Sequence, residues 1–431
     1  MATPFLYRAW VAASSVMLPF AGRQSMAKLR RAEVEPKRAR EKLGHASQPR
    51  PAGQLIWFHA ASVGESLSVL ALIDRMGRAL PQAHFLITSG TATSGRLVGS
   101  RLPPRTQHQF APLDAPGPLN RFLNHWRPDA ALFVESELWP QMLRRPHARG
   151  TAMALINARL SQRSIARWQK QPALAGFLFG VFDLILTQND AMARAMGTIN
   201  APADRVAAGI NLKSMAGPLP QDDDTIAKAR KALDGRPVWI ASSTHPGEEK
   251  AVLEAHRQLL ERFPDLCLIL VPRHPERGDE VAGLIASVGL SHGRRTRGDM
   301  PQEQVYLADT LGELGTWYAL SGIVFLGGSL HPIGGHNPYE VAQAGAMVLS
   351  GTHVTNFAET YAEMEAAGAA RLVAGTQDLA DRVADLLSND IARASGVASA
   401  KSYAGAQTDK LDSIAERLIT ALRLRERGPH A

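Results

Sequence analysis

The sequence predicts an α/β protein built from two doubly wound, Rossmann-like halves. From residue 54 onward, short apolar runs alternate with amphipathic stretches, as parallel strands alternate with helices in open sheets. This alternation stops at a proline-rich, acidic stretch, residues 217–224, and then starts again. The 431 residues exceed one ordinary hydrophobic core and suit two domains of roughly 150 to 200 residues each. We therefore expect two similar domains that face each other across a cleft.

The strands of each half are predicted where the apolar runs lie. In the first half these runs are residues 55–58, 85–88, 130–134, 152–156 and 184–186. In the second half they are residues 238–241, 267–271, 305–307, 323–326 and 347–349. Helices are predicted at 66–78, 118–125, 248–263, 341–346 and 408–426, of which the last can pack across both domains. Ligands of open α/β sheets bind at the carboxyl ends of the strands, so the residues after each strand are the candidates for function.

Composition and charge exclude several classes of protein. A single cysteine, Cys267, excludes an intramolecular disulfide and a zinc site of paired thiolates, and we expect it to be a small buried hydrophobe. The net charge is +8, and the segment from Arg23 to Lys42 holds eight basic and three acidic residues. This concentration of charge indicates an attachment segment, not a nucleic-acid groove, so no nucleic-acid partner is expected.

Residues 5–20, just before the basic segment, are apolar and include Tyr7 and Trp10. They fall a little short of the ~20 residues that span a bilayer. An N-terminal membrane-anchoring helix with a basic cytoplasmic stem accounts for both features, whether it spans the membrane or lies along it. A secretory signal peptide and a helix packed on the protein's own surface are the alternatives.

The segment 327–340, Gly-Gly-Ser-Leu-His-Pro-Ile-Gly-Gly-His-Asn-Pro-Tyr-Glu, follows a predicted strand and precedes a predicted helix. A strand, a glycine-rich turn and a helix start place free backbone N–H groups and a helix dipole where an anion can sit. Glu340 lies in the first turn of that helix, where its carboxylate can reach a ribose diol. Four glycines in nine residues exceed the needs of a turn, so a nucleotide site is predicted, with a structural loop as the alternative.

Acidic and basic residues follow the strands of the first half. Glu65 lies at a predicted helix start after strand 55–58, where it can act as a general base for a hydroxyl or simply interact with the helix dipole. Glu135 and Glu137 follow strand 130–134, where one can stabilise a cationic sugar and the other can cap a helix, unless both are solvated loop acids. Lys213, close to the linker, can meet a phosphate or a sugar carboxylate, or it can simply be solvated, as most lysines near linkers are.

The second half offers groups suited to a nucleotide. Arg273, between Pro272 and a second proline at 275, has a planar charged fork that suits phosphate. The loop 309–314 can clasp a base through its backbone. There is no Walker A pattern and no His-Glu-x-x-His, and the one Asp-x-Asp lies in the polar linker, so neither a metal nor a cofactor is expected.

Taken together and in order, these loops resemble the transferases of 3-deoxy-D-manno-oct-2-ulosonic acid (Kdo). The resembling segments are residues 59–65, 135–140, 157–161, 209–213, 241–245, 272–277, 309–314 and 327–340. The resemblance implies the two-domain GT-B glycosyltransferase fold. It also implies inverting transfer of Kdo from CMP-Kdo to the lipid A precursor, lipid IVA, at the cytoplasmic face of the bacterial inner membrane.

The resemblance further implies roles for single residues. Glu65 would be the general base, and Glu135 and Lys213 would stabilise the transition state. The residues that would bind the CMP part of the donor are Pro272, Arg273, Leu311, Gly312, Glu313, Asn337, Pro338, Tyr339 and Glu340.

The implied organisation has five parts: an anchor and basic stem at 1–44, an acceptor-binding domain at 45–216, a linker at 217–236, a CMP-Kdo-binding domain at 237–405 and a helix at 406–431. The chain departs from the family pattern at Ser214 and Met215, in the loop 88–95, and at Tyr339, where leucine is common. Because of the first two departures, the sequence leaves open which residues contact the acceptor. It also leaves open the number of Kdo units added. The alternatives are another GT-B enzyme that uses a nucleotide sugar and a catalytically silent membrane-bound scaffold. The presence of both Glu65 and Arg273 argues against the scaffold, because a silent protein has no need for both.

Overall fold

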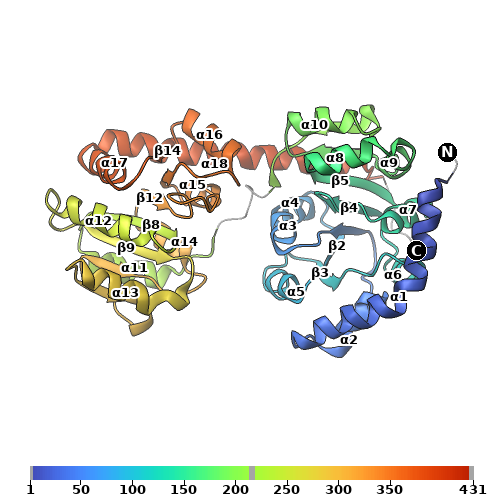
Figure 1. The fold of residues 1–431 in the computed structure, drawn as a ribbon, viewed down its shortest axis with the longest axis horizontal. Helices are drawn as coiled ribbons and strands as arrows, with labels where there is room; N and C mark the ends of the chain where they lie inside the picture. Colours follow the sequence, from blue (N-terminus) through green and yellow to red (C-terminus); the bar gives the residue numbers. More distant parts are fainter. Residues whose placement is uncertain (1–2, 213–218, 427–431) are drawn as a thin grey trace. The chain divides into compact units, whose positions relative to one another are not determined.

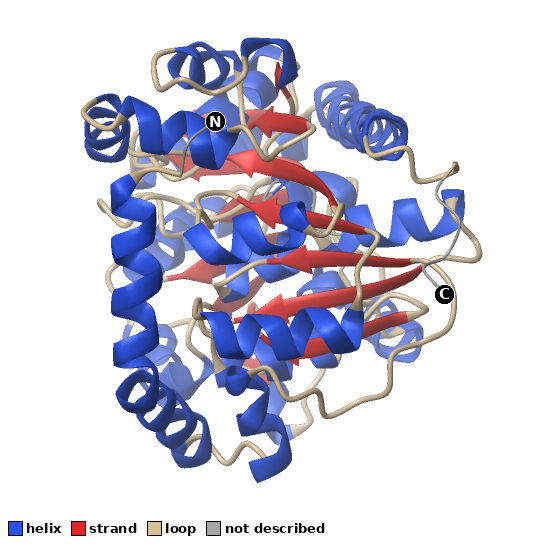
Figure 2. Ribbon diagram, turned by 90° about the vertical axis from the view of Figure 1, so that its right-hand side faces the viewer, coloured by secondary structure: helices blue, strands red, loops and turns tan. Residues whose placement is uncertain are grey.

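The computed structural model of the chain describes residues 3–212 and 219–426 (Figure 1). The chain divides into two compact units. The first unit comprises residues 1–216 and 409–431, and the second comprises residues 217–408. Each contains one seven-stranded parallel sheet. Helices flank the sheet of the first unit, which faces the viewer in Figure 2.

The sheet of the first unit has the strand order β3-β2-β1-β4-β5-β6-β7. Its strands are β1 (Leu55–His59), β2 (His84–Ser89), β3 (Thr106–Phe110), β4 (Ala130–Val134), β5 (Ala152–Ala158), β6 (Leu184–Thr187) and β7 (Val206–Ala208). The five predicted strands are confirmed. The sequence pattern missed β3, which reads Thr-Gln-His-Gln-Phe, and β7, which has three residues, because neither forms an apolar run.

The helices of the first unit cover both faces of its sheet. They are α3 (Val63–Ser68), α4 (Leu70–Ala79), α5 (Ala92–Gly99), α6 (Pro116–Trp126), α7 (Pro140–Ala148), α8 (Gln162–Gln169), α9 (Pro172–Phe179), α10 (Asp190–Gly197) and the 3-10 turn η2 (Ala203–Arg205). Alternate residues of β1 enter two different cores, Ile56 and Phe58 on one face and Leu55 and Trp57 on the other. Burial on both faces explains why this strand reads as a continuous apolar run.

The sheet of the second unit has the order β10-β11-β9-β8-β12-β13-β14. Its strands are β8 (Val238–Thr244), β9 (Cys267–Pro272), β10 (His292–Arg294), β11 (Val305–Leu307), β12 (Ile323–Leu326), β13 (Met347–Gly351) and β14 (Ala370–Val373). The five predicted strands are again confirmed, and the short strands β10 and β14 were missed. Cys267 is buried in β9, as expected, and this burial raises the pKa of its thiol to about 12.

The second unit has seven helices of its own and two 3-10 turns among the described residues. They are α11 (Asp223–Leu233), α12 (Glu248–Leu260), α13 (Gly278–Ser287), α14 (Leu314–Tyr318), α15 (Tyr339–Gln343), α16 (Ala358–Ala366), α17 (Thr376–Ser388), η4 (Pro275–Arg277) and η5 (Arg295–Arg297). The prediction of a linker over 217–236 needs correction, because α11 fills much of it. Asp222 caps α11 by accepting a hydrogen bond from the Thr225 N–H at 3.1 Å, and Ile226, Ala229 and Leu233 are buried.

The last helix, α18 (Asp390–Ala421), begins well before the predicted start at 406. Its residues up to Thr408 belong to the second unit and those from Asp409 to the first. Only the later part carries an apolar stripe, in which Leu411, Ile414 and Leu418 join the core of the first unit. The earlier part is rich in Ala, Gly and Ser, so periodicity alone did not reveal it.

The N-terminal segment forms α1 (Phe5–Arg31), followed by α2 (Pro36–Ala39) and the 3-10 turn η1 (Arg40–Leu43). Helix α1 lies beside α6 and α7 (Figure 1). Trp10 Nε1 donates to Asp114 at 2.6 Å, and the Gln141 amide donates to the Ser14 hydroxyl at 2.7 Å. The contact with the protein's own surface agrees with one of the alternatives drawn from the sequence. No helix in the described ranges 3–212 and 219–426 is long and apolar enough to cross a membrane.

Candidate active site

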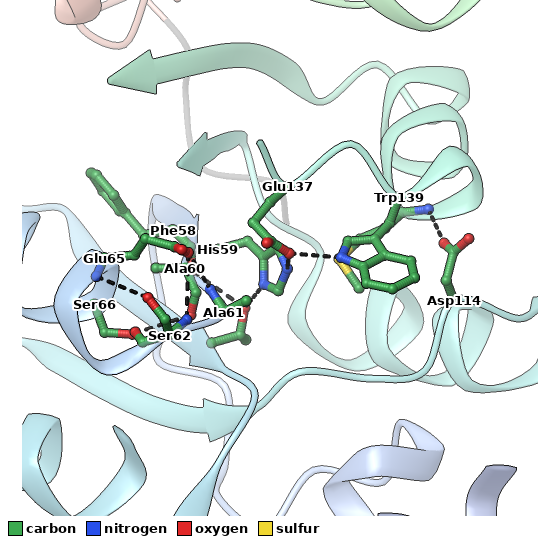
Figure 3. Close-up of polar contacts among 12 residues, drawn as sticks. Phe58, His59, Ala60, Ala61, Ser62, Glu65, Ser66, Asp114, Glu137 and Trp139 are labelled. Carbon is green, nitrogen blue, oxygen red and sulfur yellow. Dashed lines mark hydrogen bonds and ion pairs between the residues drawn. The ribbon is translucent and has the colours of Figure 1, made fainter. Parts of the chain in front are cut away.

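Glu65 lies at the amino end of α3, directly after β1 (Figure 3). Its backbone N–H donates to the Ser62 hydroxyl at 3.2 Å. Its carboxylate Oε2 accepts from the N–H groups of Ala61 at 2.9 Å and Ser62 at 3.4 Å, which completes a capping box. Oε1 makes no hydrogen bond with the residues that the structure describes. Glu65 therefore does interact with the start of α3, and this interaction leaves its carboxylate oxygen Oε1 available to a substrate.

A cluster of polar side chains around His59 lies beside this loop (Figure 3). The buried His59 at the end of β1 has its Nδ1 2.9 Å from the Thr88 hydroxyl and its Nε2 3.3 Å from the Glu137 carboxylate. Trp139 Nε1 donates to the same carboxylate at 2.7 Å. Burial raises the pKa of Glu137, but the hydrogen bond and charge of His59 and the Trp139 bond outweigh it, so the pKa is lowered overall. Sequence reasoning did not find this pairing, because its partners lie on three separate segments.

The idea that one of the two carboxylates caps a helix needs correction for Glu137. Asp114 caps the start of α7, because its carboxylate accepts hydrogen bonds from the N–H groups of Met142 at 2.6 Å and Gln141 at 3.3 Å. Glu137 instead connects the loop after β4 to His59 at the end of β1. It therefore fixes the position of the loop that carries Glu135.

Glu135 lies at the carboxyl end of β4 and is 8% exposed. The Asn157 amide, at the end of the neighbouring β5, donates to Glu135 Oε1 at 3.3 Å and accepts from the Leu212 N–H at 3.1 Å. Both Glu135 and Asn157 have left-handed backbones, with φ of 55° and 53°. Strained, non-glycine residues of this kind cluster at functional sites. Lys213, the other expected transition-state residue, lies outside the described residues.

Backbone N–H groups of the glycine loop after β12 already have a hydrogen-bond acceptor within the protein, which the sequence did not predict. The fully buried Glu248, in the first turn of α12, accepts from the N–H groups of Gly328 at 2.7 Å, Ser329 at 2.8 Å and Leu330 at 2.8 Å. It also accepts from the His245 N–H at 3.0 Å. The expectation that these N–H groups are free for an anion was wrong, because an internal carboxylate has taken them.

Glycine is required in this loop by close packing. At Gly334, with φ of 111°, a Cβ would lie 2.3 Å from the Asn356 side chain. At Gly328, with φ of 69°, a Cβ would lie 2.9 Å from the imidazole of His336. The structural-loop alternative therefore explains part of the glycine content. The helix that follows, α15, has only five residues, so its dipole is weak support for an anion site.

The residues expected to bind CMP follow neighbouring strands of the second unit. Pro272 ends β9, and Arg273 follows it with an exposed side chain and an N–H that donates to the Thr244 carbonyl at 3.0 Å. In the loop after β11, Leu311 is 78% exposed and Gly312 has a φ of 86°.

Glu313 is engaged by an arginine that the sequence did not single out. Arg295 pairs with its carboxylate at 2.7 Å, and the hydrogen bond from this guanidinium lowers the pKa of Glu313. The Thr310 hydroxyl bonds to the same carboxylate. Glu313 therefore shapes the loop, while the exposed backbone and side chain of its neighbours remain available to a ligand.

The segment 337–340 combines structural and exposed groups. The Asn337 side chain accepts from the Tyr339 N–H at 3.1 Å. Tyr339 is 1% exposed, and its hydroxyl donates to the Ala404 carbonyl of α18 at 3.2 Å. Pro338 is buried and Glu340 is half-buried in the first turn of α15. The Tyr339 side chain is thus part of the packing against α18, which sets it apart from the other proposed CMP contacts.

Three histidines gather at the ends of β8, β9 and β12. His245 and His336 are in hydrogen-bond contact, with their Nε2 atoms 2.9 Å apart, and the His274 ring packs edge-on against His245 at 5.8 Å. Each one lies inside a motif that the sequence had marked, but their meeting depends on the fold. Within the described parts of the chain, no group of three or more His, Cys, Asp or Glu side chains could hold a metal ion.

Comparison with known proteins identifies relatives of this chain. Residues 37–216 match the family model described as 3-deoxy-D-manno-octulosonic-acid transferase (kdotransferase). The 3-deoxy-D-manno-octulosonic acid transferase of Haemophilus influenzae is 34% identical over 80% of this chain and 81% of that protein. The protein of the same name from Bordetella pertussis is 33% identical over 86% of this chain and 90% of that protein.

A solved structure shows the same fold. A putative UDP-N-acetylglucosamine 2-epimerase from Listeria monocytogenes aligns with a TM-score of 0.57 over 87% of this chain and 98% of its own, at 14% identity. The C-terminal CMP-Kdo binding domain of WaaA from Acinetobacter baumannii is 36% identical, covers 42% of this chain and 97% of its own, and gives a TM-score of 0.39. The two Rossmann-like units form a fold of the GT-B class, as the resemblance implied.

Proposed function

The chain belongs to the family of 3-deoxy-D-manno-octulosonic acid transferases, and we propose that it transfers Kdo from CMP-Kdo to the lipid A precursor lipid IVA. Membership makes it a glycosyltransferase and disfavours both the silent scaffold and enzymes that transfer other sugars. The donor, the acceptor and the roles of single residues are the content of the proposal.

The observation that carries the proposal is the position of Glu65 and Glu135 in the first unit. They follow β1 and β4, which are neighbouring parallel strands, so both carboxylates lie at the same edge of one sheet. Glu65 keeps Oε1 for an acceptor hydroxyl while Oε2 is held by two backbone N–H groups. A carboxylate fixed in this way is oriented for proton abstraction before substrate arrives.

The chemistry assigns a task to each carboxylate. As CMP departs, the anomeric carbon of Kdo gains positive charge, and a buried carboxylate such as Glu135 stabilises it. Glu65 takes the proton of the attacking hydroxyl of the acceptor, and a single displacement inverts the anomeric centre. Lys213 would offset the charge of the phosphate or of the sugar carboxylate.

The second unit is proposed to bind the cytidine nucleotide. Arg273, the loop 311–313 and the segment 337–340 follow β9, β11 and β12, which belong to one sheet with β8 between β9 and β12. Arg273 supplies a permanent charge for the phosphate, and the exposed loop at 311–312 offers backbone groups and an apolar side chain to the base.

Helix α1 is proposed to hold the enzyme on the cytoplasmic surface of the inner membrane, where a lipid acceptor resides. Its side chains Phe5, Val16 and Phe20 are 80%, 78% and 65% exposed. Exposed basic residues follow at Arg23 and in the last turn of the helix. Apolar side chains that enter the interface, beside cations that meet anionic headgroups, are typical of a helix that lies in the membrane surface.

The test is a transfer assay with CMP-Kdo generated in situ and tetraacylated lipid A precursor, with product masses recorded. Glu65→Gln is the informative variant, because its amide oxygen can still accept from the Ala61 N–H while the base is lost. We expect the wild type to add one or more Kdo units and the variant to lose roughly 10²–10⁴-fold in rate. No transfer by the folded wild type would refute the function, and full activity of Glu65→Gln would refute the role of Glu65 alone.

A further inference from the structure

His245 and His336 come from separate segments of the second unit and meet ring against ring. His245 follows β8, and His336 lies in the glycine loop after β12. Their Nε2 atoms are 2.9 Å apart, and the rings stack with centroids 5.2 Å apart and an interplanar angle of 13°. A hydrogen bond between two imidazole nitrogens uses one proton, so two neutral rings must hold different tautomers.

We propose that this histidine pair, together with Arg273, binds the phosphate of the cytidine nucleotide and takes up a proton when CMP is bound. The inference rests on the proposed function, because it requires a cytidine nucleotide at this unit. It adds two phosphate-binding residues and a proton linkage.

The N–H groups of residues 328–330 in the glycine loop are already hydrogen-bonded, so side chains must supply the donors for a phosphate. Glu248 already accepts hydrogen bonds from the N–H groups of Gly328, Ser329 and Leu330. An anionic phosphate placed there would also meet the negative charge of that carboxylate. The phosphate therefore needs hydrogen-bond donors and positive charge from outside this part of the loop.

Such donors gather at the ends of adjacent strands. The strands β9, β8 and β12 are neighbours in the sheet, and they lead to Arg273, His245 and the loop of His336 respectively. The Arg273 guanidinium forms no hydrogen bond or ion pair with the described residues, and its charge is felt by both rings. Both histidines are half-buried, so a ligand can reach them.

The pKa values of both imidazole rings of the pair are lowered. Burial, followed by the neighbouring His245 and Arg273, lowers the pKa of His336 to about 4. Burial also lowers the pKa of His245, where His274 and Arg273 act in the same direction and the carboxylates Glu248 and Glu249 oppose them. The pair is therefore neutral at pH 7 in the free protein. The exposed His331 lies close to Gly247 at the same turn.

A bound phosphate reverses this balance. A dianion beside the rings favours the protonated imidazole, so its binding raises the pKa values of the pair and draws a proton from solvent. During transfer, the bond from the anomeric carbon to the phosphate oxygen breaks and both electrons remain on that oxygen. The phosphate changes from one negative charge to two, and the pair stabilises this increase. The pair donates hydrogen bonds, while the acceptor proton goes to Glu65.

The close approach of the rings is built into the loop. A Cβ at Gly328 would lie 2.9 Å from the His336 ring, and the φ of 69° also disfavours other residues. The contact therefore supports a specific position for His336.

The experiment is calorimetric titration of the full-length protein with CMP at pH 7 in two buffers of different ionisation enthalpy. The dependence of the measured heat on buffer gives the number of protons taken up. Cytidine, which lacks the phosphate, is the ligand control. His245→Gln and His336→Gln are the test variants, and His292→Gln in β10 is the matched control.

We expect the wild type and His292→Gln to take up a proton with CMP and none with cytidine. Each test variant should lose this uptake and about tenfold in CMP affinity, as the loss of a charge-assisted hydrogen bond implies, with cytidine binding unchanged. CMP binding without proton uptake, or test variants that behave as wild type, would overturn the inference and leave the proposed function standing. Absence of CMP binding to the folded wild type would overturn both.

Where a test variant does not fold, the wild type alone decides the matter. Nuclear magnetic resonance of protein labelled with ¹⁵N-histidine follows the protonation of each ring with pH. CMP must raise the pKa of at least one ring of the pair, and cytidine must not. Unchanged titration of both rings on saturation with CMP would refute the inference.

Discussion

The Glu248 carboxylate lies 2.7 Å from the Gly328 N–H and turns the glycine loop of the second unit into an internal anion site that the protein itself fills. Glu248 is fully buried and begins α12, so the loop after β12 is tied to the helix after β8. The bonds to Ser329, Leu330 and His245 complete this connection. The loop is thus held in place before any nucleotide arrives.

This arrangement predicts a large loss of stability for Glu248→Gln. The amide has one oxygen that accepts and an NH₂ group that cannot, so at least one buried N–H loses its partner. We expect the free energy of unfolding to fall by about 2–4 kcal/mol, measured by urea denaturation. Glu254→Gln, on the same helix, removes a carboxylate that pairs with Arg257 at the surface and should leave the free energy of unfolding close to that of the wild type. Equal effects of both substitutions would contradict the structural role of Glu248.

The capping box of α3 allows stability and catalysis to be separated. Ser62→Ala removes the oxygen that accepts from the Glu65 N–H and leaves the Glu65 carboxylate in place. We expect a stability loss of about 1 kcal/mol, seen in chemical denaturation, with transfer activity within a few-fold of the wild type. Glu65→Gln should show the opposite pattern. If Ser62→Ala abolishes transfer while the protein stays folded, the hydroxyl itself takes part in the reaction.

The sequence predicted ten of the described strands and the two Rossmann-like halves, because parallel strands buried on both faces leave long apolar runs. The GT-B class of fold was implied by the family resemblance. The sequence also marked the strand ends as the place for function. It could not predict that Glu248 occupies the N–H groups of the glycine loop or that His59 meets Glu137. Such contacts join residues far apart in the chain, and no local pattern encodes them.

The start of α18 and the presence of α11 were not predicted, for a related reason. An apolar stripe locates the part of α18 that enters the core of the first unit, but the earlier turns, rich in small residues, carry no such stripe. Helix α11 was hidden by the acidic residues that cap and begin it. A polar stretch that resembles a linker can therefore form a helix when its N-terminal cap is strong and only a narrow face of the helix is buried.

Tyr339 offers a test of one residue carried over from the family resemblance. Its ring is buried and its hydroxyl bonds to the Ala404 carbonyl, so Tyr339→Phe should cost about 0.5–1.5 kcal/mol of stability and leave CMP affinity unchanged. Thermal unfolding and CMP titration of the same preparation measure both quantities. Arg273→Ala is the comparison, because it should weaken CMP binding with little effect on stability. A clear loss of CMP affinity in folded Tyr339→Phe would show that the hydroxyl contacts the nucleotide.

The pair of His59 and Glu137 predicts a dependence of stability on pH. Although burial raises the pKa of Glu137, the hydrogen bonds and the His59 charge lower it overall, below the ordinary value of 4.5. A carboxylate with a lowered pKa contributes stability that is fully present above its unfolded pKa and is lost as pH falls through the folded value. Glu137→Gln lacks this ionisation. The stability advantage of the wild type over the variant should therefore shrink as the pH falls below about 4.5, as measured by urea denaturation at each pH. An advantage that grows as the pH falls below about 4.5 would show that the pKa of Glu137 is raised in the folded protein and that burial outweighs the contributions of His59 and Trp139.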